Sequence, residues 1–193
     1  MLAAIILSGG ASRRMGSPKA LLSYQGRPFL EHLLDVARHP QIGVRRVVLG
    51  ADAEPIAKEV NLAPEEIVIN EDWEKGQLSS IQAALRSLPP QTDGIILFLI
   101  DHPLISSALV EELVESFYSS GKSIVLPVYE GKRGHPVIFS SALYEELKNA
   151  PLDTGARSVV WAHSGEVQIV QTNEEGCILN LNDPGTMQRA LGS

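Results

Sequence analysis

The chain opens with the apolar run Leu2–Leu7 (LAAIIL), which continues directly into Ser8–Lys19 (SGGASRRMGSPK). An apolar run of this length that leads into two glycines predicts a strand buried on both faces and followed by a loop. Because glycine has no side chain, Gly9 and Gly10 would let the loop backbone approach a ligand closely. We therefore predict that this loop cradles a phosphate group.

The charge of the same region favours a small anionic ligand. The first 30 residues contain four basic residues and no acidic residue, so they carry +4 in a chain whose net charge is −7. The other residues therefore carry −11. A cationic island in an acidic protein favours a small polyanion, whereas a nucleic-acid backbone would require a broad basic surface.

The spacing of the loop excludes two common phosphate-binding motifs. The dinucleotide motif G-x-G-x-x-G is absent, because Gly9 and Gly10 are adjacent. A Walker loop needs Gly-Lys-Ser/Thr at the start of a helix, but Pro18 stands before Lys19 and disfavours a helix at Ser17. We therefore expect Lys19 to project from an extended segment.

Composition predicts an ordinary soluble domain. The 193 residues are 44% hydrophobic and 20% charged, and the 5% aromatic content argues against base-stacking platforms for nucleic acid. The single cysteine, Cys177, cannot close a disulfide within the chain and reads as a small buried hydrophobe, which fits a reducing compartment. The first residues are too short for a membrane span and lack the basic start of a signal peptide. We expect a cytoplasmic protein that binds neither nucleic acid nor membrane.

Hydrophobic periodicity predicts alternating helices and strands after the first strand. In chain order we expect helix 28–38, strand 44–49, helix 55–60, strand 66–70, helix 76–88, strand 95–100 and helix 106–120. This order calls for an α/β fold with a mainly parallel sheet and right-handed crossovers. From residue 123 the pattern loosens into strands 123–128 and 137–139, helix 142–148, strands 167–170 and 177–181, and a last helix after Pro184. No linker interrupts the chain.

Three predicted strands end in polar residues, at Ser8–Gly10, Asn70–Asp72 and Asp101. Ligands of such sheets bind at the carboxyl ends of the strands. Asp101 follows six apolar residues, and a carboxylate there is costly to bury unless it is paired or bound to a cation. A helix cap, or a turn with Pro103, is the alternative explanation.

The glycine loop resembles the signature of the molybdenum cofactor nucleotidyltransferases, L-A-[AG]-G-x-S-x-R-M-G-x-x-K. The matching residues are Leu7, Gly9, Gly10, Ser12, Arg14, Met15, Gly16 and Lys19, with Ser8 in place of the usual alanine. The resemblance implies a Rossmann-like three-layer sandwich of the nucleotide-diphospho-sugar transferase type with a small substrate lobe. It divides a single domain (1–193) into a nucleotide-binding part (about 1–120), an acceptor-side lobe (about 121–175) and a C-terminal metal segment with a helix (about 177–193).

The same resemblance assigns roles in the loop. It implies that the nucleotide phosphates contact Leu7, Ser8, Gly9, Gly10, Ser12, Arg13 and Lys19. Arg14 and Lys19 would be catalytic, because they would neutralise charge developing towards pyrophosphate.

The resemblance also implies a magnesium site. The family carries an Asp-x-Pro sequence whose aspartate holds Mg²⁺, which corresponds to Asp101, although His102 departs from the expected middle residue. Asn182 stands where related enzymes carry the second ligand, and an amide oxygen is a weaker but legitimate ligand. The neighbouring Asp183 is an alternative ligand, and ordinary turn and cap chemistry explains the segment Asn180–Pro184 equally well.

Three further segments are similar to the family. Asn70–Ser80 places small polar residues at a helix N-terminus, where the resemblance implies contacts of Asn70, Gly76, Gln77 and Ser79 with base and ribose, unless the serines are helix caps. Arg133-Gly-His-Pro and Asp153-Thr-Gly-Ala-Arg157 match acceptor-side motifs. Arg133, His135 and Arg157 are therefore the expected acceptor-binding residues.

A cationic loop, one strand-end carboxylate and no nucleophile–base pair together favour nucleotidyl transfer. An acceptor phosphate with a second pKa of about 6 needs no general base, so positioning and charge neutralisation suffice. The resemblance implies transfer of CMP from CTP to the phosphate of molybdopterin with Mg²⁺ as cofactor, and transient contact with a molybdoenzyme or its chaperone. GTP as donor, a sugar or alditol phosphate as acceptor, and a non-catalytic nucleotide-binding regulator remain alternatives.

Overall fold

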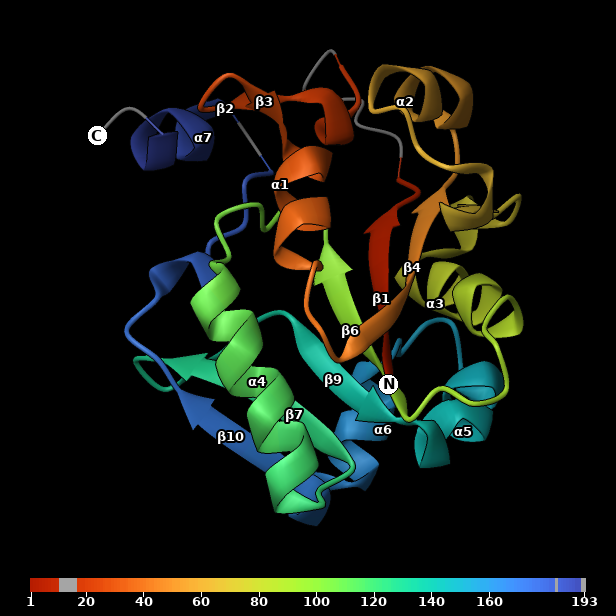
Figure 1. The fold of residues 1–193 in the computed structure, drawn as a ribbon, viewed down its shortest axis with the longest axis vertical. Helices are drawn as coiled ribbons and strands as arrows, with labels where there is room; N and C mark the ends of the chain where they lie inside the picture. The colour runs from red at the N-terminus through yellow and green to blue at the C-terminus, as the bar shows by residue number, and fades with distance from the viewer. Residues whose placement is uncertain (11–16, 183, 192–193) are drawn as a thin grey trace.

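A computed structural model describes residues 1–10, 17–182 and 184–191 of the chain. The opening apolar run forms β1 (Leu2–Ser8), in which every residue is buried. On its two sides β1 pairs in parallel with β4 (Ile42–Leu49) and β6 (Gly94–Leu99), and β4 pairs in parallel with β5 (Ile67–Ile69). The carboxyl ends of these four strands therefore meet at one edge of the sheet (Figure 1).

The second part of the chain extends the same sheet. Its strands are β7 (Ile124–Tyr129), β8 (Lys132–Arg133), β9 (Val137–Ser140) and β10 (Val167–Gln171). The strand order is β10-β7-β9-β6-β1-β4-β5, with β8 on β7. Only the pairings made by β8 and β9 are antiparallel in this sheet, so the described residues confirm the mainly parallel α/β prediction.

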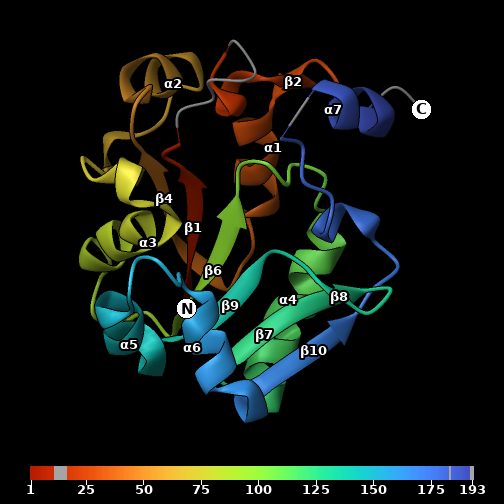
Figure 2. The same ribbon diagram turned by 180° about the vertical axis from the view of Figure 1, so that it is seen from behind.

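Helices cover both faces of the sheet (Figures 1 and 2). One layer contains α1 (Phe29–Val36), α2 (Ala53–Glu59) and α4 (Ser107–Ser120), and the other contains α3 (Gln77–Arg86), α5 (Tyr144–Asn149) and α6 (Arg157–Ala162). The side chains of β1 alternate between the two cores, with Ala4 and Ile6 on the first face and Ile5 and Leu7 on the second. The fold is thus the expected three-layer sandwich.

The ends of α4 show how closely local sequence signals specify this scaffold. The hydroxyl of Ser106 accepts a hydrogen bond from the backbone N–H of Leu109 at 3.1 Å, and Gly121 ends the helix at φ = +64°. Among the described helices, none combines the length and the apolar character needed to cross a membrane.

Four local features differ from the sequence-based expectations. The predicted strand 177–181 is wrong, because Glu175–Cys177 forms a 3₁₀ turn and the following residues bond to loops instead of a strand. Lys19 begins a 3₁₀ turn, Lys19–Leu21, so the expected extended segment ends at Pro18. The hairpin of β2 (Ser23–Tyr24) and β3 (Arg27–Pro28), and helix α6, were not expected.

The C-terminal part returns to the carboxyl edge of the sheet. The backbone N–H of His135 donates to the carbonyl of Cys177, and that of Leu181 donates to the carbonyl of Asp101, both at 2.8 Å. The last helix, α7 (Pro184–Leu191), lies beside the β2–β3 hairpin in both views (Figures 1 and 2). Residues near 180 thereby lie next to Asp101, at the end of β6.

Candidate functional site

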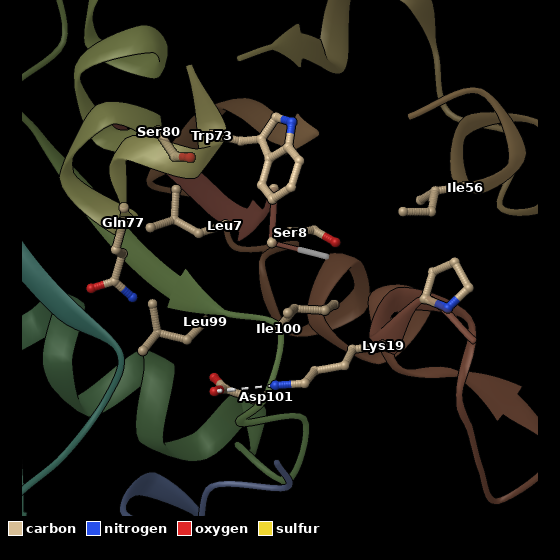
Figure 3. Close-up of a pocket in the computed structure, with 14 residues that line it drawn as sticks. Leu7, Ser8, Lys19, Ile56, Trp73, Gln77, Ser80, Leu99, Ile100 and Asp101 are labelled. Atoms are coloured by element: carbon tan, nitrogen blue, oxygen red, sulfur yellow. Dashed lines mark ion pairs between the residues drawn. The ribbon is translucent and has the colours of Figure 1, made fainter. Parts of the chain in front are cut away.

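A cavity of about 270 Å³ lies at the carboxyl ends of β1 and β6 (Figure 3). It is lined by Leu7, Ser8, Gly9, Gly10, Pro18, Lys19, Ile56, Trp73, Gly76, Gln77, Ser80, Leu99, Ile100 and Asp101. The fold therefore brings the glycine loop, the strand-end aspartate and the start of α3 around one space. We call it the first cavity.

Backbone packing fixes the described part of the glycine loop. A Cβ atom on Gly50, directly after β4, would collide with the carbonyl oxygen of Gly9 and lie 2.7 Å from Cγ of Trp73. The loops that follow β1 and β4 are thus in direct contact, which only glycine allows at this position. The predicted phosphate-binding or catalytic residues Ser12, Arg13 and Arg14 lie outside the described residues, so their roles stay predictions.

Asp101 is held by contacts from both ends of the chain. Its Oδ2 accepts a hydrogen bond from Nδ2 of Asn180 at 2.8 Å and lies 4.0 Å from Nζ of Lys19. The Lys19 ammonium also donates to Oδ1 of Asn182. The carboxylate is 18% exposed, so pairing with a cation offsets the cost of its burial. Figure 3 shows the Lys19 side chain extending across the cavity towards Asp101.

The oxygen atoms around Lys19 suit a divalent cation. Asp101 offers a carboxylate and Asn182 an amide oxygen, and oxygen ligands are what Mg²⁺ and Mn²⁺ prefer. Beside them, Oδ1 of Asn180 is buried without a hydrogen-bond partner among the described atoms. Within the described ranges no group of three or more His, Cys, Asp or Glu side chains could hold a metal alone. A cation here would therefore need further oxygen ligands from a bound phosphate. Asp183 lies outside the described residues.

Asn70 and Ser79 support the cavity wall from behind. The amide of Asn70 is buried and donates to the hydroxyls of Ser79 and Ser80, at 2.9 Å each. The Ser79 hydroxyl lies 2.7 Å from the carbonyl of Gly76, where φ is +99° and a side chain would be strained. These bonds shape the start of α3, where Gly76, Gln77 and Ser80 line the cavity while Asn70 and Ser79 do not.

A second cavity, of about 440 Å³, contains the three expected acceptor-side residues Arg133, His135 and Arg157. It is also lined by residues of α6 and of the segment before it, and by the apolar side chains of Leu97, Leu126, Val137 and Phe139. Gln77 lines both cavities. The two cavities therefore meet at the first residue of α3.

His135 is a neutral group in the second cavity. Burial disfavours its charged form and the nearby His102 adds to this effect, so the pKa of His135 falls to about 4. The two rings are tilted, with centroids 5.2 Å apart. Burial also lowers the pKa of His102, although Asp101 opposes this shift. At neutral pH His135 thus supplies a hydrogen-bonding ring and no positive charge.

Sequence analysis did not single out Trp73 or Trp161 as lining residues. These are the only two tryptophans of the chain, and each lines a different cavity. For Trp73 the available signal was an aromatic residue among the charged neighbours of Glu71–Lys75, whereas Trp161 follows Val159 and Val160 and carries no such signal. An aromatic side chain among charged neighbours is often exposed for a ligand.

Two curated proteins whose names give different activities are similar to the chain. The chain is 29% identical to the nicotine blue oxidoreductase of Paenarthrobacter nicotinovorans, over 97% of this chain and 95% of that protein. It is 30% identical to a probable molybdenum cofactor guanylyltransferase of Flavobacterium johnsoniae, over 76% of this chain and 77% of that one.

Solved structures share the whole fold. The crystal structure of Rv0371c from Mycobacterium tuberculosis H37Rv matches with a TM-score of 0.84 at 29% identity, covering 100% of this chain and 97% of that one. A complex of Rv0371c with manganese matches at 0.77 and 26% identity, covering 100% and 98%. Residues 4–167 match the family described as the MobA-like NTP transferase domain. Since this match spans most of the chain, the protein belongs to the MobA-like NTP transferase family and is a nucleotidyltransferase.

Proposed function

We propose that the protein transfers a nucleoside monophosphate from a nucleoside triphosphate in the first cavity to a phosphorylated small molecule in the second. One observation carries this proposal above the others. Lys19, Asp101 and Asn182 converge beside the glycine loop, although 163 positions separate Lys19 from Asn182. Positive charge, a carboxylate and an exposed backbone are the parts that nucleotidyl transfer requires.

Each residue of the first cavity has a defined task in this reaction. The backbone of Gly9 and Gly10 approaches the triphosphate, and the Lys19 ammonium neutralises charge on the departing pyrophosphate. Asp101 and Asn182 would hold Mg²⁺ together with phosphate oxygens. When bound, such an ion draws negative charge away from the phosphates and orients them. The manganese complex of Rv0371c supports a divalent cation in this fold.

The bond changes are those of an in-line displacement at phosphorus. An oxygen of the acceptor phosphate attacks the α-phosphorus, the bond from that phosphorus to the oxygen shared with the β-phosphorus breaks, and pyrophosphate leaves with that oxygen. The acceptor phosphate is largely ionised at neutral pH, with a second pKa of about 6, so no side chain has to remove a proton. The neutral ring of His135 agrees with this scheme, because it is a hydrogen-bonding group near the acceptor and adds no charge.

We further propose CTP as donor and molybdopterin as acceptor. The similarity of Arg133–Pro136 and Gly155–Arg157 to cytidylyltransferase motifs supports CTP, whereas the paired glycines Gly9 and Gly10 resemble the guanylyl branch. The relative named as a probable molybdenum cofactor guanylyltransferase supports a molybdenum cofactor acceptor and makes GTP the competing donor.

The test is pyrophosphate release with each of the four nucleoside triphosphates, Mg²⁺ and molybdopterin. Of the four nucleoside triphosphates, we expect only CTP to give pyrophosphate, and mass spectrometry of the product should show the added cytidylyl group. Release with GTP alone would reassign the donor, and release only with a sugar or alditol phosphate would reassign the acceptor. Tight nucleotide binding without pyrophosphate from any mixture would contradict the proposal and favour a regulator.

A further inference from the structure

The most exposed aromatic side chain of the second cavity comes from α6. Trp161 is 62% exposed, although an indole is among the largest apolar groups in proteins. Arg157 lies four residues earlier in the same helix, so the two side chains project from one face of α6. Both line the second cavity. The helix thus presents an aromatic face and a positive charge side by side.

The walls around Trp161 are apolar, and the charge at the cavity is positive. Val137 and Phe139 of β9 are buried, while Leu152, in the segment before α6, is 39% exposed. Across residues 1–10, 17–182 and 184–191, neither Arg133 nor Arg157 forms an ion pair or hydrogen bond with another side chain. The acidic lining residue, Asp153, accepts a hydrogen bond from the backbone N–H of Thr154.

These features select a class of ligand. An exposed indole beside an apolar wall binds a flat ring system most favourably, since stacking removes the contacting face of each ring from water. Two guanidinium groups without a carboxylate partner gain most from a phosphate, which accepts paired hydrogen bonds from arginine. A sugar or alditol phosphate would satisfy the arginines but leave the indole uncovered.

We propose that Trp161 is the specificity-determining residue of the second cavity and stacks on the flat heteroaromatic ring of a phosphate-bearing acceptor. Arg157 and Arg133 supply the charge that the phosphate needs. This inference rests on the proposed function, because it assumes that the acceptor occupies the second cavity. It adds that the ring, in addition to the phosphate, is recognised, and that α6 recognises it.

The first experiment measures binding by calorimetry with two probes, neopterin monophosphate and glycerol 3-phosphate. We expect wild type to bind the pterin phosphate at least tenfold more tightly than glycerol 3-phosphate. Trp161→Ala should weaken pterin phosphate binding roughly tenfold or more, because aromatic stacking contributes on that order. Trp161→Phe should restore most of it, and CTP binding should not change in either variant.

The matched control is Ile169→Ala, which removes another exposed apolar side chain, 42% exposed, from β10. It should bind both probes like wild type. Equal binding of pterin phosphate by wild type and Trp161→Ala would overturn the inference. Equal losses for the two phosphates would also overturn it, because the indole would then have no preference for a ring.

The two tryptophans provide a second readout that needs no turnover. Trp73→Phe leaves Trp161 as the only tryptophan, and Trp161→Phe leaves Trp73. We expect pterin phosphate to quench the fluorescence of the first variant and CTP to change that of the second. Quenching of Trp73 alone by pterin phosphate would place the ring in the first cavity and contradict the inference.

Failure of this inference can be distinguished from failure of the proposed function. If Trp161→Ala releases pyrophosphate with an unchanged acceptor KM, the proposed transfer reaction is supported and the proposed role of Trp161 is contradicted. If no mixture yields pyrophosphate while pterin phosphate still quenches the fluorescence of Trp161, the transfer reaction is contradicted and ring binding at Trp161 is supported.

Discussion

The two cavities that meet at Gln77 are built from different parts of the fold. The first lies at the ends of buried parallel strands, where Gly9 and Gly50 are in backbone contact and the charges of Lys19 and Asp101 face each other. The second presents exposed side chains from a two-residue strand, β8, and a six-residue helix, α6. The difference suggests a division of labour. Under the proposed function, the core would build the site that performs the chemistry, and the surface would select the acceptor.

Substitution of Lys19 should have the largest effect and tests the chemical side of this division. We expect Lys19→Ala to lower kcat for pyrophosphate release by about 100-fold or more, since one charged group aimed at the leaving phosphates contributes on that order. Some stability should be lost as well, because the Lys19 side chain is only 21% exposed and offsets the burial of Asp101, but Asn180 still donates to that carboxylate and the fold should persist. Steady-state kinetics and thermal unfolding measure the two effects.

The matched control for Lys19 is Lys122→Ala. Lys122 is a partly exposed lysine that pairs with Glu166 at 3.4 Å and lines neither cavity. It should turn over like wild type. Normal turnover in Lys19→Ala would remove Lys19 from the mechanism and leave the first cavity without its proposed chemical role.

Asp101→Asn should have the next largest effect and tests the cation site. We expect affinity for Mn²⁺ in the presence of CTP to fall about 10- to 100-fold or more, because loss of even an outer-shell partner has effects of that size. Electron paramagnetic resonance counts the free Mn²⁺. Asp35→Asn, which removes an exposed carboxylate paired with Arg27, is the control. Unchanged Mn²⁺ binding would show that the cation is held elsewhere.

Sequence reasoning located the first cavity well because its signals are local. The buried run Leu2–Leu7, the two glycines and the isolated Asp101 each describe the end of a strand. Parallel topology then brings strand ends together, which the structure confirms for Ser8–Gly10 and Asp101. Asn70 is the exception, because it does not line the cavity and its side-chain amide donates hydrogen bonds to the hydroxyls of Ser79 and Ser80.

The second cavity was harder to predict because long-range contacts build it. Helix α6 is a six-residue segment, so its periodicity is too short to recognise, and Trp161 was not assigned. The mostly apolar residues 177–181 suggested a strand, but their backbone forms hydrogen bonds with the backbone of His135 and Asp101 instead. Such partners lie far apart in sequence, and no local pattern encodes them.

Gly50→Ala tests whether the first cavity depends on backbone packing. The added Cβ would collide with the carbonyl of Gly9 and lie 2.7 Å from Cγ of Trp73, so both loops must move. We expect the free energy of unfolding to fall by about 2 kcal/mol, as overpacking usually costs, and CTP affinity to fall with it. Urea denaturation and calorimetry measure these changes.

Gly165→Ala is the matched control for Gly50→Ala, because a Cβ there would meet no atom within 4 Å. It should leave stability and nucleotide affinity close to wild type. If Gly50→Ala were as stable and bound CTP as tightly, the loops would be less constrained than their contact indicates, and the contrast between the cavities would weaken.

The smallest expected effect concerns His135, a half-buried residue of the second cavity whose charged form is disfavoured by burial. Its pKa is about 4 in the folded protein and has the ordinary value of 6.5 when unfolded. Between these values the unfolded chain binds a proton that the folded chain does not, so stability rises with pH across this window and is fully regained above it. Lowering the pH from 7 to 5.5 should therefore reduce the free energy of unfolding, by about 1 kcal/mol from this residue.

His135→Gln should make the dependence of stability on pH shallower, because glutamine does not titrate. The rest of the slope should include His102, whose pKa burial lowers in the same direction. Urea denaturation of both proteins at pH 7, 5.5 and 4.5 gives the comparison. Parallel slopes would mean that water reaches the ring and that His135 belongs with the exposed side chains. A shallower slope would mean that the second cavity joins the exposed side chain of Trp161, proposed to recognise the acceptor ring, to a buried ring of His135 that stays neutral.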